Sequence, residues 1–215
     1  MAKQPHESLK SHSVYEALRR RILSMEIAPG ATVGKEEIAA EFGVSVAPVM
    51  RALQRLASDG LVEVRPQHGS FVTSLTAELV RESMFIRTAI EVEGVRQATM
   101  KRDQNLCETL RANIDRQEQA LEAGDLLLME RLDEAMHAAI LAALGHDRAS
   151  RILQAARGTV DRMRRMILLQ GGAAKSLEEH RLITISICMG DHDLAAAAMR
   201  AHLNGVAEIF EDHFG

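Results

Sequence analysis

A chain of 215 residues can bury a substantial core and lies between one large domain and two small ones, of which we favour two. It is 47% hydrophobic and 26% charged, with 3% aromatic residues and no Trp, which indicates a folded, helix-rich protein and disfavours an all-β fold. The net charge of -4 argues against a uniformly basic nucleic-acid binder. The apolar runs are too short to cross a bilayer and the first residues lack the apolar stretch of a signal peptide, so we expect a cytoplasmic protein without a membrane partner.

The charge is unevenly distributed along the chain. Residues 1–75 contain 9 Lys or Arg and 8 Asp or Glu, a net charge of +1, whereas residues 76–215 contain 17 and 22, a net charge of -5. If the first segment is to hold DNA, its basic side chains must therefore gather on one face.

The first predicted element is an amphipathic helix that begins near residue 13. Its apolar residues Val14, Leu18, Ile22 and Met25 recur at helical spacing, and an APG sequence then ends it. This pattern predicts one helix that buries a single face.

Residues 35–56 carry the internal pattern of a helix-turn-helix. Ala39 is small where two helices would cross, and Gly43 lies in the turn between them. Ser45 is placed to cap the second helix, and Pro48 fits its first turn, where no amide donor is needed. The packing positions are all apolar: Ile38, Phe42, Val44, Val49 and Ala52.

The next stretch, LVEVRPQHGSFVTSL, predicts two short strands joined by a turn, in which Gly69 supplies the necessary conformational freedom. A helix, a helix-turn-helix and a β-ribbon together make a winged helix-turn-helix. We therefore predict a DNA-binding domain over residues 1–75.

From Thr76 onward every pattern is helical. Thr76 can cap a helix that runs to about Lys101. Five more helices with short connections follow, which implies an antiparallel bundle. The predicted protein is thus mainly α, with an N-terminal winged helix-turn-helix and a C-terminal all-helical domain over residues 76–215. The further helices are expected at 104–123, 125–144, 147–169, 176–189 and 193–213.

Two polar residues interrupt the apolar face of the helix predicted at 125–144. Asp133 and His137 are spaced i, i+4, so their side chains project from one face. The neighbours on that stripe predict that this face points inward, and a carboxylate and an imidazole there need a specific reason. These neighbours are Leu126, Met129, Ile140, Leu141 and Leu144.

Two further histidines lie on the last two predicted helices. His180 and His202 are equidistant from residue 191, inside the turn that joins those helices, so an antiparallel hairpin places them at one height. If the helix of Asp133 and His137 packs on this hairpin, one carboxylate oxygen and three imidazole nitrogens converge. Such a set suits a divalent transition metal, with Zn²⁺ or Ni²⁺ favoured over Mn²⁺ and Fe²⁺ by the imidazoles. The sequence does not choose among these four metals.

Residues 13–213 resemble a GntR-family transcriptional regulator of the FadR subfamily with a C-terminal FCD ligand-binding domain. Four stretches carry the resemblance: VYEALRRRILSMEIAPG, EEIAAEFGVSVAPVMRALQRLASDGLVEVRPQHGSFV, LDEAMHAAI and EEHRLITISICMGDHDLAAAAMRAHL. The resemblance implies a homodimer that binds a roughly palindromic double-stranded DNA operator. It also implies release or recruitment by a small effector, commonly a carboxylic acid, with repression as the expected mode.

The same resemblance assigns roles to residues of the predicted bundle. In metal-binding members one Asp and three His hold the ion, and by position these are Asp133, His137, His180 and His202. Arg87, in FIRTAIE, matches a recurrent Arg and is a candidate to bind the effector anion; a salt bridge to Glu91 is the alternative.

The predicted recognition helix departs from the family. Members typically read VSRTPVREAL where this chain reads VSVAPVMRAL. Val46 and Met50 therefore stand where the family has two basic residues. Ala47 replaces a Thr, and Arg51 replaces a Glu. Arg51 does not simply replace the base at 50, because one residue turns a helix by about 100°. DNA binding is expected to be weakened or retargeted. The candidate DNA-binding residues are Lys35, Ser45, Val46, Ala47, Met50, Arg51, Gln54, Arg55, Arg65 and Gly69.

Three functions are compatible with these patterns. The favoured one is an effector-responsive DNA-binding regulator, which is not an enzyme. The alternatives are a metabolite- and metal-binding protein whose DNA head has lost its function, and a metal-dependent hydrolase or lyase. Four protein ligands resemble a binding site more than a site for activated water, and Glu134, Glu178 and Glu179 are expected to face away from it.

Overall fold

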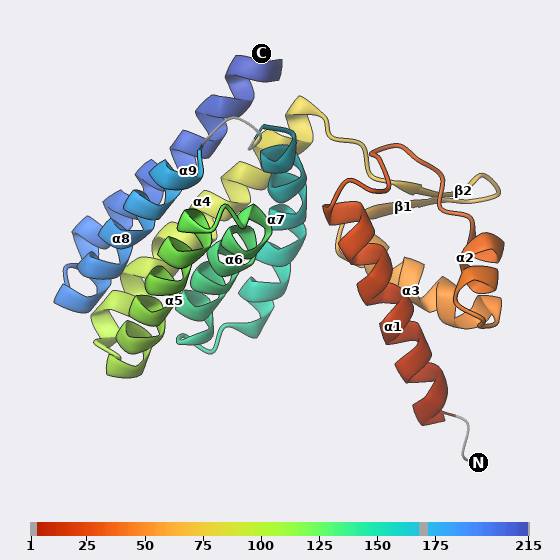
Figure 1. Ribbon diagram of the computed structural model, residues 1–215, viewed down its shortest axis with the longest axis horizontal. Helices are drawn as coiled ribbons and strands as arrows, with labels where there is room; N and C mark the ends of the chain where they lie inside the picture. Colours follow the sequence, from red (N-terminus) through yellow and green to blue (C-terminus); the bar gives the residue numbers. More distant parts are fainter. Residues whose placement is uncertain (1–3, 168–171, 215) are drawn as a thin grey trace. The chain divides into compact units, whose positions relative to one another are not determined.

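The computed structural model describes residues 4–167 and 172–214 (Figure 1). The chain divides into two compact units. Unit 1 comprises Met1–Val80 with Gln154–Arg165, and unit 2 comprises Arg81–Leu153 with Met166–Gly215. Among the described residues, no helix has both the length and the hydrophobicity that a membrane span requires.

Unit 1 contains the predicted helix, helix-turn-helix and two-stranded ribbon, which confirms the predicted fold class. The strands are antiparallel, with Val62 opposite Val72 and Arg65 opposite Gly69. A single bridge from Thr32 to Phe71 adds a third short segment that the sequence pattern did not predict. The elements are α1 (Gln4–Leu23), α2 (Lys35–Glu41), α3 (Val46–Ser58), β1 (Val62–Arg65) and β2 (Gly69–Val72).

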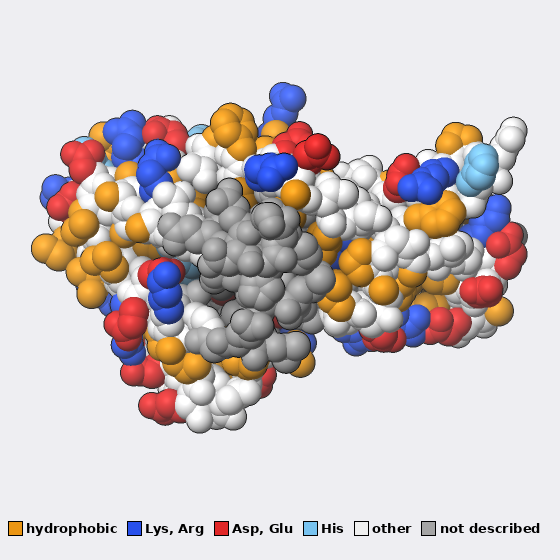
Figure 2. Space-filling model, turned by 90° about the horizontal axis from the view of Figure 1, so that it is seen from above, with side chains coloured by type: hydrophobic (Ala, Val, Ile, Leu, Met, Phe, Trp, Pro, Cys, Tyr) orange, Lys and Arg blue, Asp and Glu red, His pale blue; other side chains and the backbone are white. Residues whose placement is uncertain are grey.

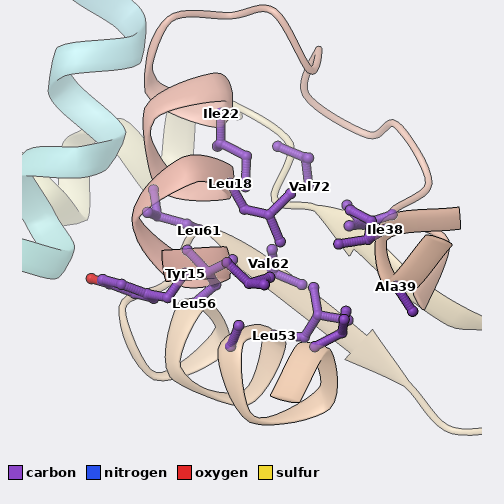
Figure 3. Packing of buried hydrophobic residues seen from close by; sticks show 14 residues of the cluster. Tyr15, Leu18, Ile22, Ile38, Ala39, Leu53, Leu56, Leu61, Val62 and Val72 are labelled. Carbon is purple, nitrogen blue, oxygen red and sulfur yellow. The ribbon is translucent and has the colours of Figure 1, made fainter. Parts of the chain in front are cut away.

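The core of the winged helix-turn-helix lies where α1 packs on α3, and α3 packs on α2 and β1 (Figure 3). Val14, Leu18 and Ile22 are buried there, as their helical spacing predicts. Met25 was expected on the same stripe, but α1 ends at Leu23 and Met25 has a positive φ of 62°. The helix therefore stops two residues before the last position of the apolar pattern.

The turn before α3 has the predicted glycine but lacks the predicted side-chain cap. Gly43 has a φ of +60°, a conformation that residues with a Cβ rarely adopt. Ser45 occupies the N-cap position with an extended backbone, yet its side chain makes no cap hydrogen bond. The expectation that the Ser45 side chain caps α3 was therefore wrong, and Ser45 is an exposed residue.

Tyr15 joins α1 to α3 at the edge of this core. Its ring is buried, and its hydroxyl donates a hydrogen bond of 2.6 Å to Oδ2 of Asp59, the residue after α3. Burial and this hydrogen bond to a carboxylate raise the pKa of Tyr15 to about 12. Because the unfolded chain releases this proton near pH ~10, the contribution to stability is complete below that pH and is lost as pH rises towards 12.

This shift can be measured directly, because the chain has one Tyr and no Trp. We expect the near-ultraviolet phenolate absorbance of the folded protein to show Tyr15 still mostly neutral at about pH 11. The urea-unfolded chain should titrate near pH ~10, and Asp59→Asn should lower the folded pKa by removing the adjacent negative charge. A folded protein that titrates together with the unfolded chain would contradict the Tyr15–Asp59 contact.

Part of α7 also belongs to unit 1. Arg162 is completely buried and donates hydrogen bonds to the carbonyl oxygens of Thr73, at 2.7 Å, and Gly158, at 3.1 Å. Burial lowers the pKa of Arg162 to about 10. A Cβ at Gly158 would lie 2.9 Å from Leu61 Cδ2, so the absence of a side chain permits this close packing.

The helices after Thr76 follow the predicted order closely. Thr76 caps the first of them, since its Oγ1 accepts a hydrogen bond of 3.2 Å from the amide of Leu79. Within unit 2, α5 packs against α6 and α8, and α8 packs against α9 (Figure 1). The helices are α4 (Ala77–Lys101), α5 (Gln104–Glu122), α6 (Leu126–Ala142), α7 (Asp147–Ile167), α8 (Ala173–Met189) and α9 (His192–Phe214).

Candidate functional site

Four buried polar side chains meet inside unit 2. Asp133 and His137 come from α6, His180 from α8 and His202 from α9. Each offers one ligand atom, and these four atoms all lie within 4.8 Å of one another. The structure thus brings together the four residues that the sequence pattern singled out as candidate metal ligands.

The three imidazole rings surround a common centre. The ring centroids of His180 and His202 are 4.7 Å apart, and that of His137 lies 5.6 Å and 5.3 Å from them. Nε2 of His180 lies 3.3 Å from Oδ1 of Asp133 but makes no hydrogen bond to any residue that the structure describes. A buried nitrogen of this kind is costly unless it has a partner, and a metal ion would supply one.

The opposite ring nitrogens are all held by acceptor oxygens. Nδ1 of His180 donates to Oε1 of Gln117 at 2.8 Å, and Nδ1 of His202 donates to Oε2 of Glu179 at 2.8 Å. Nδ1 of His137 donates to Oε2 of Glu91. A ring that keeps its proton on Nδ1 presents the lone pair of Nε2, which is the form that binds metals. The donor set is three imidazoles and one carboxylate, which fits Zn²⁺, Ni²⁺, Mn²⁺ or Fe²⁺.

A buried charge chain connects this cluster to α4. Arg87 Nε donates to Glu91 Oε1 at 2.7 Å, and Glu91 accepts from His137 through its other oxygen. The side chains of Arg87 and Glu91 are 1% and 2% exposed. The i, i+4 salt bridge considered for Arg87 is present, while its Nη1 makes no hydrogen bond to any described residue.

The surroundings of the cluster differ from the sequence expectation in two places. Leu126 was expected on the inward stripe of α6 but is 49% exposed at the first residue of the helix. Glu179 was expected to face solvent, but it accepts the hydrogen bond from His202. Burial raises the pKa of Glu179. The hydrogen bond from His202 and the nearby charge of Lys175 outweigh this effect, so the pKa of Glu179 lies below its usual value.

Sequence reasoning missed the three acceptors that orient the imidazoles. Gln117 did leave a signal, because it continues the buried stripe of Leu106, Leu110 and Ile114 on α5 at helical spacing. It also donates to Asn113 Oδ1 at 2.6 Å, which fixes which end of its amide faces His180. Glu91 and Glu179 left no comparable signal, because their roles depend on contacts between helices.

The candidate DNA-binding residues lie on unit 1. Most side chains on the outer face of α3 are exposed, although Met50 is half-buried. Gly69 has a φ of +105° and begins β2, next to the turn of the wing. Lys35 begins α2 and lies 3.7 Å from Glu36. The exposed α3 residues among the candidates are Val46, Ala47, Arg51, Gln54 and Arg55.

Several basic side chains of unit 1 are already paired with acidic ones. Arg65 donates to Glu63 at 2.9 Å and lies 4.7 Å from the ring centre of Phe71, and Arg21 pairs with Glu41. The visible surface correspondingly shows Lys and Arg interspersed with Asp and Glu (Figure 2). These ion pairs neutralise part of the positive charge of unit 1.

Two family models match successive parts of the chain. Residues 10–72 match the model of the gntR family of bacterial regulatory proteins, and residues 82–205 match the FCD domain. An HTH-type transcriptional regulator in an unstable DNA locus of Streptomyces ambofaciens is 37% identical over 199 residues, covering 92% of this chain and 84% of the relative. The HTH-type transcriptional repressor RspR of Escherichia coli K12 is 32% identical, covering 92% and 87%.

Solved structures share the fold. Escherichia coli McbR/YncC superposes with a TM-score of 0.81 at 18% identity, covering 95% of this chain and 98% of that one. A GntR regulator from Rhodococcus sp. RHA1 gives 0.76 at 22% identity, covering 94% and 98%. The chain is a DNA-binding transcriptional regulator rather than an enzyme, and it belongs to the GntR family with a C-terminal FCD domain.

Proposed function

We propose that this regulator binds a divalent metal ion through Asp133, His137, His180 and His202, and that a small carboxylate effector at this site changes its affinity for DNA. The observation that carries the proposal is the buried cluster of one carboxylate and three imidazoles, each imidazole oriented by an oxygen acceptor. When bound, the ion would supply a Lewis-acidic centre for a carboxylate. Zn²⁺ and Ni²⁺ are the favoured ions because imidazole nitrogens dominate the donor set.

The role proposed for Arg87 is to attract the effector anion. Its guanidinium is tied through Glu91 to His137, and its Nη1 makes no hydrogen bond within the described residues. An effector carboxylate that accepted a hydrogen bond from Nη1 of Arg87 would gain a charge-assisted contact in addition to its contact with the metal ion. The effector class is accordingly a small carboxylic acid.

The proposed regulator acts as a homodimer of the FadR subfamily on a roughly palindromic operator. Residues 1–75 form its DNA-binding domain, and residues 76–215 bind metal, effector and the second protomer. On α3, Arg51 and Gln54 are suited to guanine and adenine edges, and Val46 or Ala47 to a thymine methyl group. Repression is the proposed mode, supported by the name of the relative RspR.

Operator selection from random duplexes tests this proposal. Metal-loaded protein is expected to enrich a palindrome whose half-sites differ from those of regulators with basic residues at positions 46 and 50. Arg51→Ala should weaken the selected site and relax the preference at one base pair per half-site, by about 1 to 3 kcal/mol for a lost bidentate contact. Footprinting and competition binding measure both effects.

The response to ligands is measured on the same duplex. Carboxylic acids are screened for release of the metal-loaded protein, and active acids should lose their effect in His180→Ala. If no duplex is enriched even at low salt, the alternative of a metabolite-binding protein whose DNA head has lost its function replaces this proposal. An unchanged footprint in Arg51→Ala would contradict the assignment of Arg51 as a base reader.

A further inference from the structure

Arg55 is held in one place on the surface of unit 1. Its guanidinium carbon lies 3.7 Å from the centre of the Tyr15 ring, a close cation–π contact (Figure 3 shows Tyr15). On the α1 side, Nη1 of Arg55 lies 3.4 Å from Nδ1 of His12. An exposed Arg normally samples many rotamers, so these contacts between α3 and α1 reduce the entropy that a binding partner would have to remove.

The Tyr15 ring, against which Arg55 packs, is itself fixed in position. Tyr15 belongs to the buried core, and its hydroxyl is bonded to Asp59, one helical turn beyond Arg55. The carboxylate nearest along α3 is thus engaged by the phenol. Among the side chains that the structure describes, none of the acidic ones forms a salt bridge with Arg55, in contrast to Arg21 and Arg65. An arginine that is exposed, oriented and not neutralised is suited to bind an external anion.

The position of Arg55 on α3 indicates which kind of anion it binds. It lies one turn after Arg51, towards the end of α3, which closes at Ser58. In helix-turn-helix proteins the first residues of the recognition helix reach base edges, whereas contacts that set its register go to the phosphates. His12, on α1, lies beside Arg55 and is also exposed.

We propose that Arg55 binds a DNA backbone phosphate rather than a base edge, and that Tyr15 is the positioning residue that holds it for this contact. This inference rests on the proposed DNA interface. It refines that interface by separating the α3 residues that read bases from Arg55, whose side chain is already oriented for a phosphate. The ligand chemistry is a phosphodiester, and the contact is independent of base sequence.

Binding to a mixed-sequence duplex of roughly 30 base pairs, followed over a range of salt concentrations, tests the inference. Arg55→Ala should lower affinity roughly tenfold near 0.1 M salt and reduce the log–log salt slope by about one unit per protomer. Tyr15→Leu should produce a similar loss by releasing the side chain, whereas Tyr15→Phe, which keeps the ring, should lose less affinity than Tyr15→Leu. Arg96→Ala, which removes a charge from α4, is the control for net charge.

Two measurements separate positioning from folding. Arg55→Lys keeps the charge but loses the planar stack, so it should keep the salt slope and lose affinity severalfold. The double variant Arg55→Ala/Tyr15→Leu should bind no more weakly than Arg55→Ala. Because Tyr15 is the single tyrosine, ¹³C-labelled tyrosine gives one set of ring resonances, which should shift when the duplex is added.

An unchanged salt slope in Arg55→Ala would overturn the phosphate assignment. Additive losses in the double variant, or Arg55→Lys binding as well as Arg55, would overturn the positioning role of Tyr15. Failure of the natural protein to bind any duplex would instead reject the proposed operator binding, so the two failures are distinguishable.

Discussion

Zn²⁺ or Ni²⁺ added to metal-free protein is expected to raise the thermal unfolding midpoint by roughly ten degrees. A ligand at about a thousand times its Kd stabilises the folded state by about 4 kcal/mol, and for a chain of this size each kcal/mol shifts the midpoint by roughly 2 to 4 °C. His180→Ala removes a donor whose ring is completely buried among the other candidate ligands. We expect this variant to lose most of the metal-dependent increase, as measured by calorimetry with and without the ion.

Another histidine, on the helix that carries His202, provides a matched control for this comparison. His192 begins α9, the helix that carries His202, but its imidazole is partly exposed and its Nδ1 lies 3.0 Å from Oδ1 of Asp193. His192→Ala should therefore retain the full metal-dependent increase. Since His180→Ala also leaves a cavity, the quantity compared is the shift on adding metal, and not the midpoint itself. An equal shift in both variants would exclude His180 as a ligand.

The sequence contained enough information to group the four candidate ligands into two pairs. Asp133 and His137 are separated by one helical turn, and His180 and His202 are symmetric about a turn, so backbone geometry alone relates the members of each pair. The helices themselves followed from apolar periodicity and from caps such as Thr76, whose bond to the amide of Leu79 is present. These features depend on contacts within one helix or one hairpin.

The features that could not be predicted depend on packing between helices. Glu179 is adjacent to His180 in sequence, yet it orients His202 on the next helix. Tyr15 and Asp59 are 44 residues apart, and neither spacing nor residue type relates them before α1 packs on α3. The sequence also suggested that Ser45 caps α3, whereas the fold leaves its hydroxyl out of the cap. Side-chain contacts of this kind are decided by tertiary structure.

Glu91 is the position at which a single substitution should have the largest combined effect on folding and metal binding. Its two oxygens accept hydrogen bonds from the buried Arg87 and from His137. Glu91→Gln keeps the shape but removes the negative charge, and an arginine left buried without its carboxylate typically costs about 3 to 5 kcal/mol. Loss of the partner that orients a ligand imidazole should also weaken metal binding by roughly 10- to 100-fold. Urea unfolding and metal titration measure the two effects.

Two further variants distinguish the roles of Glu91. Glu93→Gln removes an exposed carboxylate on the same helix, paired with Arg96, and should change neither the unfolding midpoint nor the metal affinity appreciably. Arg87→Met/Glu91→Leu removes both buried charges, so much of the lost stability should return. Metal affinity should remain low, because Nδ1 of His137 still lacks its acceptor. A double variant as unstable as Glu91→Gln would show that packing around Glu91, rather than the uncompensated charge of Arg87, determines the loss.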